Sequence, residues 1–377
     1  MFSFKGLMAN CLMRLFGLLP IQDKVVFCAF RGKMYGDNPR FIFEEMVRQF
    51  PQKKYVWLMQ KNIDIPHATV VNFFSIKALY HLATSMIWID CSRKQRWIHK
   101  RKKQYYVQTW HGDVCIKMIE KDAERELPED YILEAKHDSS ITDLMLSGSD
   151  FRTNNFRNAF WYDGEILEEG TPKSVIYHEN PKNIHDNVLA FFGLKLNTKI
   201  ALYCPTFRAD GELTAYNIDY KHLLENLNNK WGGDWVVIVR LHPKINELQN
   251  RIQYSPKIIN GSNYSSTDEL VVACDLLITD YSGCMFNGLE ANKIVILYAS
   301  DIDTYSKNER GFYFDIRNLP FPLADDNDTL SKIIMEFDEE PYFKQFDKLR
   351  ETIGFHTDKE STIRIVKYIN EQARRKR

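Results

Sequence analysis

Three kinds of signature are missing from the sequence: paired cysteines, glycine-rich nucleotide loops and long apolar runs. The seven cysteines are scattered and form no CxxC pair, which indicates reduced thiols and argues against a disulfide scaffold or a structural zinc site. Neither GxGxxG nor GxxxxGKS/T occurs, so the fingerprints of dinucleotide-binding proteins and of P-loop nucleoside triphosphatases are absent. No uninterrupted apolar stretch reaches the roughly 20 residues that a membrane-spanning helix needs.

An excess of charge of one sign is also missing, because 50 lysines and arginines balance 50 aspartates and glutamates. Net charge therefore gives no reason to expect nucleic acid as a partner. Positive charge is nevertheless concentrated in two segments, 93–104 and 373–377. Such segments are either solvated faces of the protein or contacts with an anionic membrane surface.

The first 20 residues combine apolar and polar side chains. Lys5, Asn10 and Arg14 interrupt the apolar residues and no small-residue cleavage site follows, which argues against a signal peptide. The apolar residues recur at the spacing of an amphipathic helix, which predicts a separate N-terminal segment over 1–20. Its apolar face packs either against the protein itself or into a membrane interface.

The rest of the chain alternates short apolar runs with helical stretches, the pattern of parallel α/β sheets. Its length favours about two domains. The predicted strands are 24–30, 54–59, 69–73, 85–90, 104–110, 143–149 and 165–170 in the first half, and 199–207, 235–242, 256–260, 275–281 and 294–300 in the second. A polar, proline-bearing segment at 178–187 is a candidate linker. We therefore predict an α/β fold of two facing Rossmann-like domains with a deep cleft between them, over 21–183 and 184–377, the second including the helices that end the chain.

Polar side chains gather where the strands of the second half end. They are Arg208, Asp210, Arg240, His242, Asp280, Ser282 and Gly283. The carboxyl ends of parallel strands lie at one edge of a sheet, so these groups should converge on one crevice. An arginine fork such as Arg240 grips phosphate oxygens, and Ser282 with Gly283 offers a hydroxyl and backbone N–H groups at a helix N-terminus. The pattern favours a phosphoryl ligand; the alternatives are a surface ion pair for the arginine and a helix cap for Asp280.

A histidine and a glycine follow the strand predicted at 104–110, and the charged residues after them favour a helix. His111 is then either a structural histidine near a turn, with its ring nitrogens hydrogen-bonded within the protein, or a base or phosphate ligand at the carboxyl end of a strand. The triplet Asp301-Ile302-Asp303 has the DxD form of metal-dependent transferases. Because so short a pattern often occurs by chance, these aspartates are equally loop or cap residues, and no metal is predicted.

Seven segments, in order along the chain, resemble the CDP-glycerol glycerophosphotransferase family, which contains teichoic acid primases and polymerases and is also found in capsule synthesis. They are YGDNPRFIFEEM (35–46), QTWHG (108–112), SGSDFRTNNFRNAFWYDGEILEEGTPK (147–173), LYCPTFRADG (202–211), VRLHP (239–243), ITDYSGCMFN (278–287) and YASDIDTYSKNERGFYFD (298–315). Each segment is weak by itself, and their shared order makes the resemblance specific.

The resemblance implies two Rossmann-like domains in the glycosyltransferase B arrangement, without a metal or other cofactor. The C-terminal domain would bind a CDP-alditol donor, and the N-terminal domain would face a lipid-linked saccharide acceptor. It also implies peripheral attachment to the anionic cytoplasmic face of a bacterial cell membrane. In the implied reaction, an acceptor hydroxyl attacks the β-phosphorus of CDP-glycerol, which forms a glycerol phosphate diester and releases CMP.

The family's motifs also imply roles for particular residues. His111 matches a Trp-His-Gly histidine that would accept the proton of the acceptor hydroxyl as a general base. His242 matches an Arg-x-His-Pro histidine that would stabilise the diphosphate beside Arg240. The catalytic candidates are His111 and His242, and the substrate-binding candidates are Gly112, Asp113, Lys173, Thr206, Phe207, Arg208, Arg240, Leu241, Ser282, Gly283 and Asn287.

Several positions depart from the commonest pattern of the family. Asp113 and Val114 replace Thr-Pro, Lys173 replaces an arginine, Gly283 replaces a second serine, and Asn287 replaces an acidic residue. Asp113 would add a negative charge beside the implied phosphate site, and the other losses leave the identity of the alditol open. The alternatives are a transferase that uses CDP-ribitol, a nucleotide-sugar glycosyltransferase of the same fold, and a non-catalytic nucleotide-binding scaffold.

Overall fold

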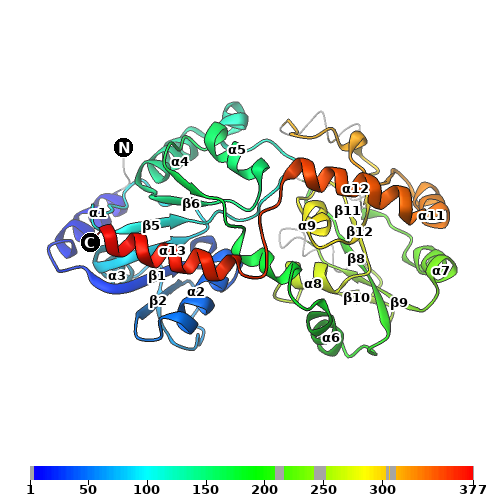
Figure 1. Ribbon diagram of the computed structural model, residues 1–377, viewed down its shortest axis with the longest axis horizontal. Coiled ribbons are helices and arrows are strands. Elements are labelled where there is room, and N and C mark those ends of the chain that lie inside the picture. The colour runs from blue at the N-terminus through cyan, green and yellow to red at the C-terminus, as the bar shows by residue number, and fades with distance from the viewer. Residues whose placement is uncertain (1–3, 209–215, 242–251, 303–304, 306–310, 377) are drawn as a thin grey trace. The chain divides into compact units, whose positions relative to one another are not determined.

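The computed structural model describes residues 4–208, 216–241, 252–302, 305 and 311–376 of the chain (Figure 1). Its internal contacts divide the chain into two compact units. The first unit comprises Met1–Asp113, Ile119–Val175 and Phe355–Arg377, and the second comprises Val114–Met118 and Ile176–Gly354. Each unit is built around one parallel sheet, as the alternating pattern of the sequence predicted.

The sheet of the first unit has seven parallel strands in the order β3-β2-β1-β4-β5-β6-β7. Its strands are β1 (Gln22–Cys28), β2 (Lys54–Met59), β3 (Ala68–Asn72), β4 (Ser85–Asp90), β5 (Tyr105–Gln108), β6 (Leu144–Leu146) and β7 (Glu165–Leu167). Its helices are α1 (Phe4–Phe16), α2 (Asp37–Gln49), α3 (Ile76–Thr84), α4 (Glu129–Ile141), α5 (Asp150–Ala159) and α13 (Ser361–Lys376), with 3₁₀ turns η1 (Phe30–Gly32) and η2 (Glu120–Glu126).

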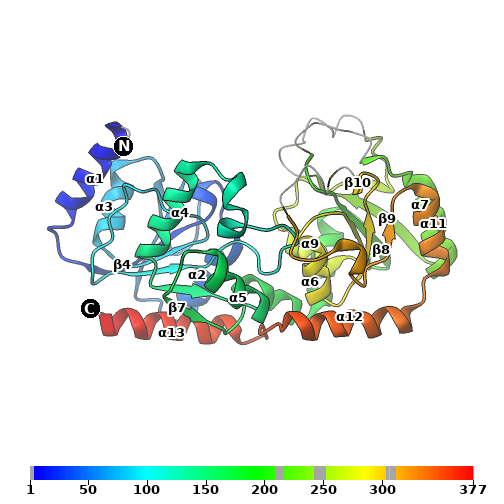
Figure 2. The same ribbon diagram turned by 90° about the horizontal axis from the view of Figure 1, so that it is seen from above.

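Alternation along β1 distributes its side chains over two cores. Val25 and Phe27 join the core that α2 and α13 cover, and Val26 and Cys28 join the core that α1 and α3 cover. Figure 2 shows α1 and α3 on one side of this sheet and α13 on the other. Burial on both faces is expected of a central strand in a parallel sheet.

The second unit has six parallel strands in the order β10-β9-β8-β11-β12-β13. They are β8 (Thr198–Cys204), β9 (Asp234–Val239), β10 (Ile258–Asn260), β11 (Leu276–Thr279), β12 (Ile294–Tyr298) and β13 (Leu323–Ala324). Its helices are α6 (Pro181–Phe191), α7 (Tyr220–Trp231), α8 (Thr267–Ala273), α9 (Cys284–Glu290), α11 (Asn327–Glu336) and α12 (Glu339–Ile353), with a 3₁₀ turn η6 (Ile316–Asn318). The 3₁₀ turn η3 (Pro172–Tyr177) begins in the first unit and ends in the second. α7 and α11 cover the face of the sheet that carries Tyr203 and Val237.

All twelve predicted strands correspond to strands of the structure, whereas the two-residue β13 was not predicted. The proposed linker at 178–187 is mostly helical, because Asn180 caps α6 and Pro181 occupies its first turn, a position where proline suits a helix. The residues that follow His111 form turns and η2, and a regular helix begins only at Glu129.

Two further differences concern the end of the chain and the basic segment 93–104. We predicted the closing helices in the second domain, but α13 packs on α2 and β5 in the first unit. Arg93 and Lys94 are 4% and 5% exposed, since Arg93 pairs with Glu120 and Asp138 and Lys94 pairs with Asp90. These two charges therefore lie on neither a solvated face nor a membrane-facing one.

Candidate functional site

His111 follows β5 at the carboxyl edge of the first sheet, as the sequence predicted. Its Nδ1 lies 2.9 Å from the carbonyl oxygen of Cys91. Because a carbonyl can only accept, Nδ1 carries the proton and, in the neutral ring, Nε2 keeps its lone pair. The rings of Trp110 and Phe30 flank the imidazole, with centroids at 4.4 Å and 5.4 Å. This geometry presents an oriented proton acceptor.

The surroundings of His111 favour its neutral form. Desolvation by the surrounding protein lowers the pKa of the imidazole, although the side chain still reaches solvent. The bond to the Cys91 carbonyl and the negative charge of Asp37 act in the opposite direction and raise the pKa, whereas Lys173 lowers it. Since the net shift is downward, the ring is unprotonated near neutral pH, as a general base requires.

Backbone strain is concentrated around this histidine. Phe30, Arg31, Asp37 and Trp110 all have φ between 47° and 57°, a region that side chains other than glycine rarely adopt. Gly112 has φ of 112°, where any side chain would be strained. Strained residues persist where the surrounding structure holds them, and they often occur at functional sites.

Asn38 and Asp37, at the start of α2, tie the loops around His111 together. The Asn38 amide donates to the carbonyl of Trp110 at 3.2 Å, and its oxygen accepts from the backbone N–H of Lys173 at 3.0 Å. The Lys173 ammonium lies 3.7 Å from a carboxylate oxygen of Asp37. Lys173 therefore lies in the surroundings of His111, and its role in substrate binding stays a prediction.

Asp113 has a structural role that the sequence did not indicate. Its Oδ1 accepts from the backbone N–H of Gly148 at 3.1 Å and lies 3.3 Å from the Thr171 hydroxyl. Its carbonyl oxygen accepts from the buried Arg152. A Cβ at position 148 would come within 2.0 Å of the Thr171 hydroxyl, so only glycine fits there. The Asp113 carboxylate thus joins three loops through Oδ1, whereas its buried Oδ2 has no hydrogen-bond partner among the described residues.

In the second unit, Arg208 lies inside the protein and binds two carboxylates. It is 2% exposed; its guanidinium lies 2.9 Å from Asp280 and donates to Asp301 at 2.6 Å. Asp280 also accepts from the backbone N–H of Thr206 at 2.8 Å. Arg208 therefore fixes the loop after β8 to the loops after β11 and β12. The first aspartate of the DxD triplet is engaged in this contact, and Asp303 lies outside the described residues.

Arg240 and Leu241 stand at the end of β9. Arg240 donates from Nε to the Thr267 hydroxyl at 2.7 Å, and from Nη1 to the carbonyls of Gly261 and Tyr264 at 2.9 and 2.7 Å. These bonds leave Nη2 as the guanidinium nitrogen that is not committed to a described residue. Leu241 is 4% exposed, and its backbone N–H lies 3.3 Å from the Ser262 hydroxyl. His242 and Asp210, which the sequence also singled out, lie outside the described residues.

The segment between β11 and α9 carries the remaining candidates. The Ser282 hydroxyl accepts from the backbone N–H of Cys284, at the start of α9. A Cβ on Gly283 would lie 3.2 Å from the carbonyl oxygen of Val114, which leaves little room for a side chain. Thr206 and Phe207 follow β8 at the same sheet edge. Within the second unit the structure thus gathers Thr206, Arg208 and Asp280, and His111, Gly112, Asp113 and Lys173 belong to the first unit.

Comparison with known proteins gives a family for this chain. Residues 12–371 match the family described as CDP-Glycerol:Poly(glycerophosphate) glycerophosphotransferase. A teichoic acid poly(glycerol phosphate) polymerase of Bacillus spizizenii is 32% identical over 350 residues, which cover 88% of this chain and 87% of the relative. The chain belongs to this family.

Other relatives agree with this assignment. A teichoic acid glycerol-phosphate transferase of Staphylococcus aureus is 27% identical over 86% of this chain and 87% of its own length. A poly(glycerol phosphate) polymerase of Staphylococcus epidermidis is 30% identical, but this chain spans only 46% of it. The solved structure of the wall teichoic acid polymerase TagF superposes with a TM-score of 0.86 at 27% identity, covering 97% of this chain and 94% of that one. The predicted fold of two Rossmann-like α/β domains and the prediction of a transferase are therefore confirmed.

A contact in the second unit explains one of the unusual positions. Where the family commonly has an acidic residue, the Asn287 amide donates to a carboxylate oxygen of Asp268 at 3.2 Å. The same oxygen accepts from the Tyr177 hydroxyl at 2.6 Å. A carboxylate at position 287 would face Asp268 and be repelled, so the amide matches its neighbour.

Sequence reasoning missed Asp37, Asn38, Arg152 and Asp268. Asp37 and Asn38 lie within the motif YGDNPRFIFEEM and could have been found there, since polar residues before an apolar run mark a helix start. Arg152 also lies within a quoted segment, 147–173, but its contact with Asp113 and the contact of Asp268 with Asn287 join separate segments, which no local pattern indicates.

Proposed function

We propose that this chain transfers glycerol phosphate from CDP-glycerol to a hydroxyl of a lipid-linked saccharide or poly(alditol phosphate) acceptor in teichoic acid synthesis. The relatives named above support the donor and the polymer. The observation that carries the proposal is the geometry of His111, whose Nδ1 lies against the Cys91 carbonyl and so leaves Nε2 as the proton acceptor of the neutral ring.

In the proposed step, the acceptor oxygen forms a new bond to the β-phosphorus and its proton passes to His111 Nε2. The bond between the β-phosphorus and the bridging oxygen breaks, and CMP leaves with that oxygen and its electron pair. Transfer of this kind depends on positioning and charge stabilisation more than on covalent catalysis. We assign donor binding to the carboxyl edge of the second sheet, with Thr206, Phe207, Arg240, Ser282 and Gly283 as contacts and His242 as the diphosphate ligand.

A second candidate is the same transfer from CDP-ribitol. The replacement of an acidic residue by Asn287 supports it, because the resemblance places this position near the donor. A teichoic acid ribitol-phosphate primase of Bacillus spizizenii is 28% identical over 97% of this chain and 96% of its own length. The two candidates share every step except recognition of the alditol.

CMP release by the purified chain tests both candidates. CDP-glycerol and CDP-ribitol are each supplied with a lipid-linked disaccharide acceptor. We expect release from one donor, reduced about 10²- to 10⁴-fold in His111→Ala, the range in which general-base catalysis contributes. His222→Ala, which changes an exposed histidine of α7, is the matched control and should retain activity. Absence of release from either donor would refute the proposed function.

We further propose that α1 attaches the chain to the cytoplasmic face of the membrane. None of the helices in the described part of the chain combines the length and apolar character needed to cross a bilayer. On α1, Phe4, Leu7, Met8 and Leu15 are 77%, 52%, 51% and 59% exposed, although Met13 is buried against the first sheet. An apolar cavity of about 700 Å³ opens between α1, α3 and the segment 94–98. An amphipathic helix with apolar side chains facing outward suits a membrane interface.

A further inference from the structure

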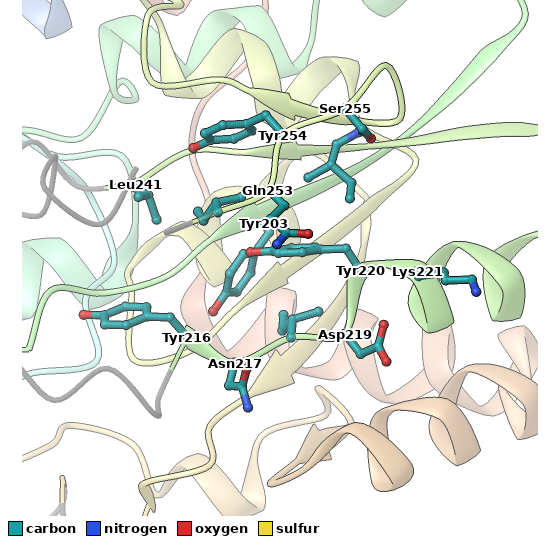
Figure 3. A pocket seen from close by; sticks show the side chains of 13 residues that line it. Tyr203, Tyr216, Asn217, Asp219, Tyr220, Lys221, Leu241, Gln253, Tyr254 and Ser255 are labelled. Atoms are coloured by element: carbon teal, nitrogen blue, oxygen red, sulfur yellow. The ribbon is translucent and has the colours of Figure 1, made fainter. Parts of the chain in front are cut away.

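A second cavity lies in the second unit, on the face of the sheet that α7 covers (Figure 3). Its volume is about 810 Å³, and residues at the end of β8, the start of α7 and the segment before β10 line it. Four tyrosines dominate the lining: Tyr203, Tyr216, Tyr220 and Tyr254. Figure 3 shows the hydroxyl ends of all four turned to the left side of the view.

Three of these tyrosines have hydroxyl groups that find no hydrogen-bond partner in the part of the chain that the structure describes. The hydroxyl oxygens of Tyr203, Tyr220 and Tyr254 are buried and contact no donor or acceptor among the described residues. Tyr203 as a whole is 1% exposed. Leaving a buried hydroxyl unpaired costs about 1–3 kcal/mol, so three in one cavity indicate an occupant that forms hydrogen bonds.

The tyrosine hydroxyls keep their protons at physiological pH. Burial raises the pKa of Tyr203, Tyr220 and Tyr254 above the ordinary value for tyrosine. Each hydroxyl can therefore donate one hydrogen bond and accept others, which matches ligand hydroxyls that do the same. The rings of Tyr203 and Tyr220, with centroids 6.3 Å apart, add apolar surface against which the carbon skeleton of a ligand can pack.

The charged residues of the lining are turned away from the hydroxyls. Asp219 caps α7 by accepting from the backbone N–H of His222 at 3.0 Å. Figure 3 shows the Lys221 side chain on the α7 side of the view, away from the tyrosine hydroxyls. Among the described lining residues Lys221 is the one cation, so these residues offer no counter-charge to a phosphate-bearing ligand at the hydroxyl end.

We propose that this cavity binds an uncharged saccharide, with its ring against the tyrosine faces and its hydroxyls paired with those of Tyr203, Tyr220 and Tyr254. Tyr216 connects the cavity to the loop after β8, because its hydroxyl donates to the Thr206 carbonyl and accepts from the Arg208 N–H, both at 3.0 Å. The saccharide site thus adjoins the proposed donor loops but uses other side chains. It goes beyond the proposed transfer and does not depend on it.

Saturation-transfer NMR of the full chain with N,N′-diacetylchitobiose tests this assignment. We expect transfer to the disaccharide, with Tyr203→Phe and Tyr254→Phe each weakening binding about three- to tenfold, the effect of one net hydrogen bond. Tyr342→Phe, which alters a paired hydroxyl in the same unit, is the matched control and should bind normally. His111→Ala should also bind the disaccharide normally. Saccharide binding can therefore be measured independently of transferase activity.

Unfolding without ligand separates a binding role from a structural one. Removing an unpaired buried hydroxyl should leave the thermal midpoint of Tyr203→Phe unchanged or raised, whereas loss of a structural hydrogen bond would lower it. Absence of saturation transfer, equal binding by the Tyr203→Phe/Tyr254→Phe double variant, or displacement of the disaccharide by glycerol 3-phosphate would each overturn the proposal.

Discussion

Single side chains around His111 determine the pH at which it can accept a proton. Desolvation lowers the pKa of the imidazole, and the Cys91 carbonyl and Asp37 limit that decrease. Protonated imidazole has no lone pair to offer, so activity should fall as the pH decreases through this lowered pKa. The acidic limb of the rate profile is therefore expected below about 6.5, the ordinary pKa of histidine.

The Asp37→Asn variant tests this balance directly. Without the carboxylate, a contribution that raises the pKa of His111 is lost and Lys173 is no longer neutralised, so the acidic limb should move to lower pH. The plateau rate should decrease far less than in His111→Ala, whose loss is about 10²- to 10⁴-fold. The measurement is kcat/KM as a function of pH, with the exposed Asp64→Asn as control. An unmoved limb, or one at higher pH, would contradict the role given to Asp37.

At the scale of elements, α1 has one face packed on the first unit and apolar side chains exposed on another. Met13 packs into the core beside α3, and the Asn10 amide donates to the Trp97 carbonyl at 2.6 Å, which fixes the helix to the first unit. Leu7 and Leu15 face outward, and Lys5 and Arg14 place positive charge on the same exposed helix. Packing against the protein, one of the two sequence interpretations of this segment, is therefore observed for part of the helix, and contact with a membrane interface stays a prediction.

Binding to anionic lipid vesicles tests the outward face. Replacing Leu7 and Leu15 together by glutamate removes apolar area and adds charge that anionic lipid repels, so sedimentation with phosphatidylglycerol vesicles should decrease at least about tenfold. The unfolding transition should be unchanged, since both side chains are exposed. Leu196→Glu changes an equally exposed leucine of the second unit and should still sediment. Vesicle binding equal to that of the unmodified chain would exclude α1 as the membrane contact.

At the scale of the whole molecule, local patterns identified the strands but not the contacts between distant residues. Tyr-Tyr-Val-Gln in β5 is recognisable as a strand because aromatic and β-branched residues are a property of the segment itself. The pairing of Arg208 with Asp301 joins residues 93 positions apart, and the inward orientation of Asp113 depends on Gly148. The sequence could therefore place His111 at a strand end, whereas the structural roles of Arg208 and Asp113 required the fold.

The prediction that α13 belongs to the second domain was wrong for the same reason. Its amphipathic pattern shows that one face is apolar, but the pattern carries no information about which core receives that face. In the structure Ile365, Val366 and Ile369 are fully buried among residues of the first sheet. The Thr362 hydroxyl also donates to the Pro172 carbonyl at 3.1 Å. The last segment of the chain thus completes the unit with which the chain begins.

This arrangement predicts which unit loses stability when the C-terminal helix is weakened. Truncating a buried isoleucine to alanine costs about 2–5 kcal/mol, so Ile365→Ala/Ile369→Ala should strongly destabilise the first unit. Hydrogen exchange should then accelerate in β1, β4 and β5, and the strands β8, β9 and β11 should keep their protection. The control is Ile334→Ala in α11, a fully buried isoleucine of the second core, which should give the reverse pattern. If the two units unfold independently, a destabilised core accelerates hydrogen exchange only in the strands of its own unit. Equal acceleration of exchange in both sheets for either variant would therefore mean that the units unfold together.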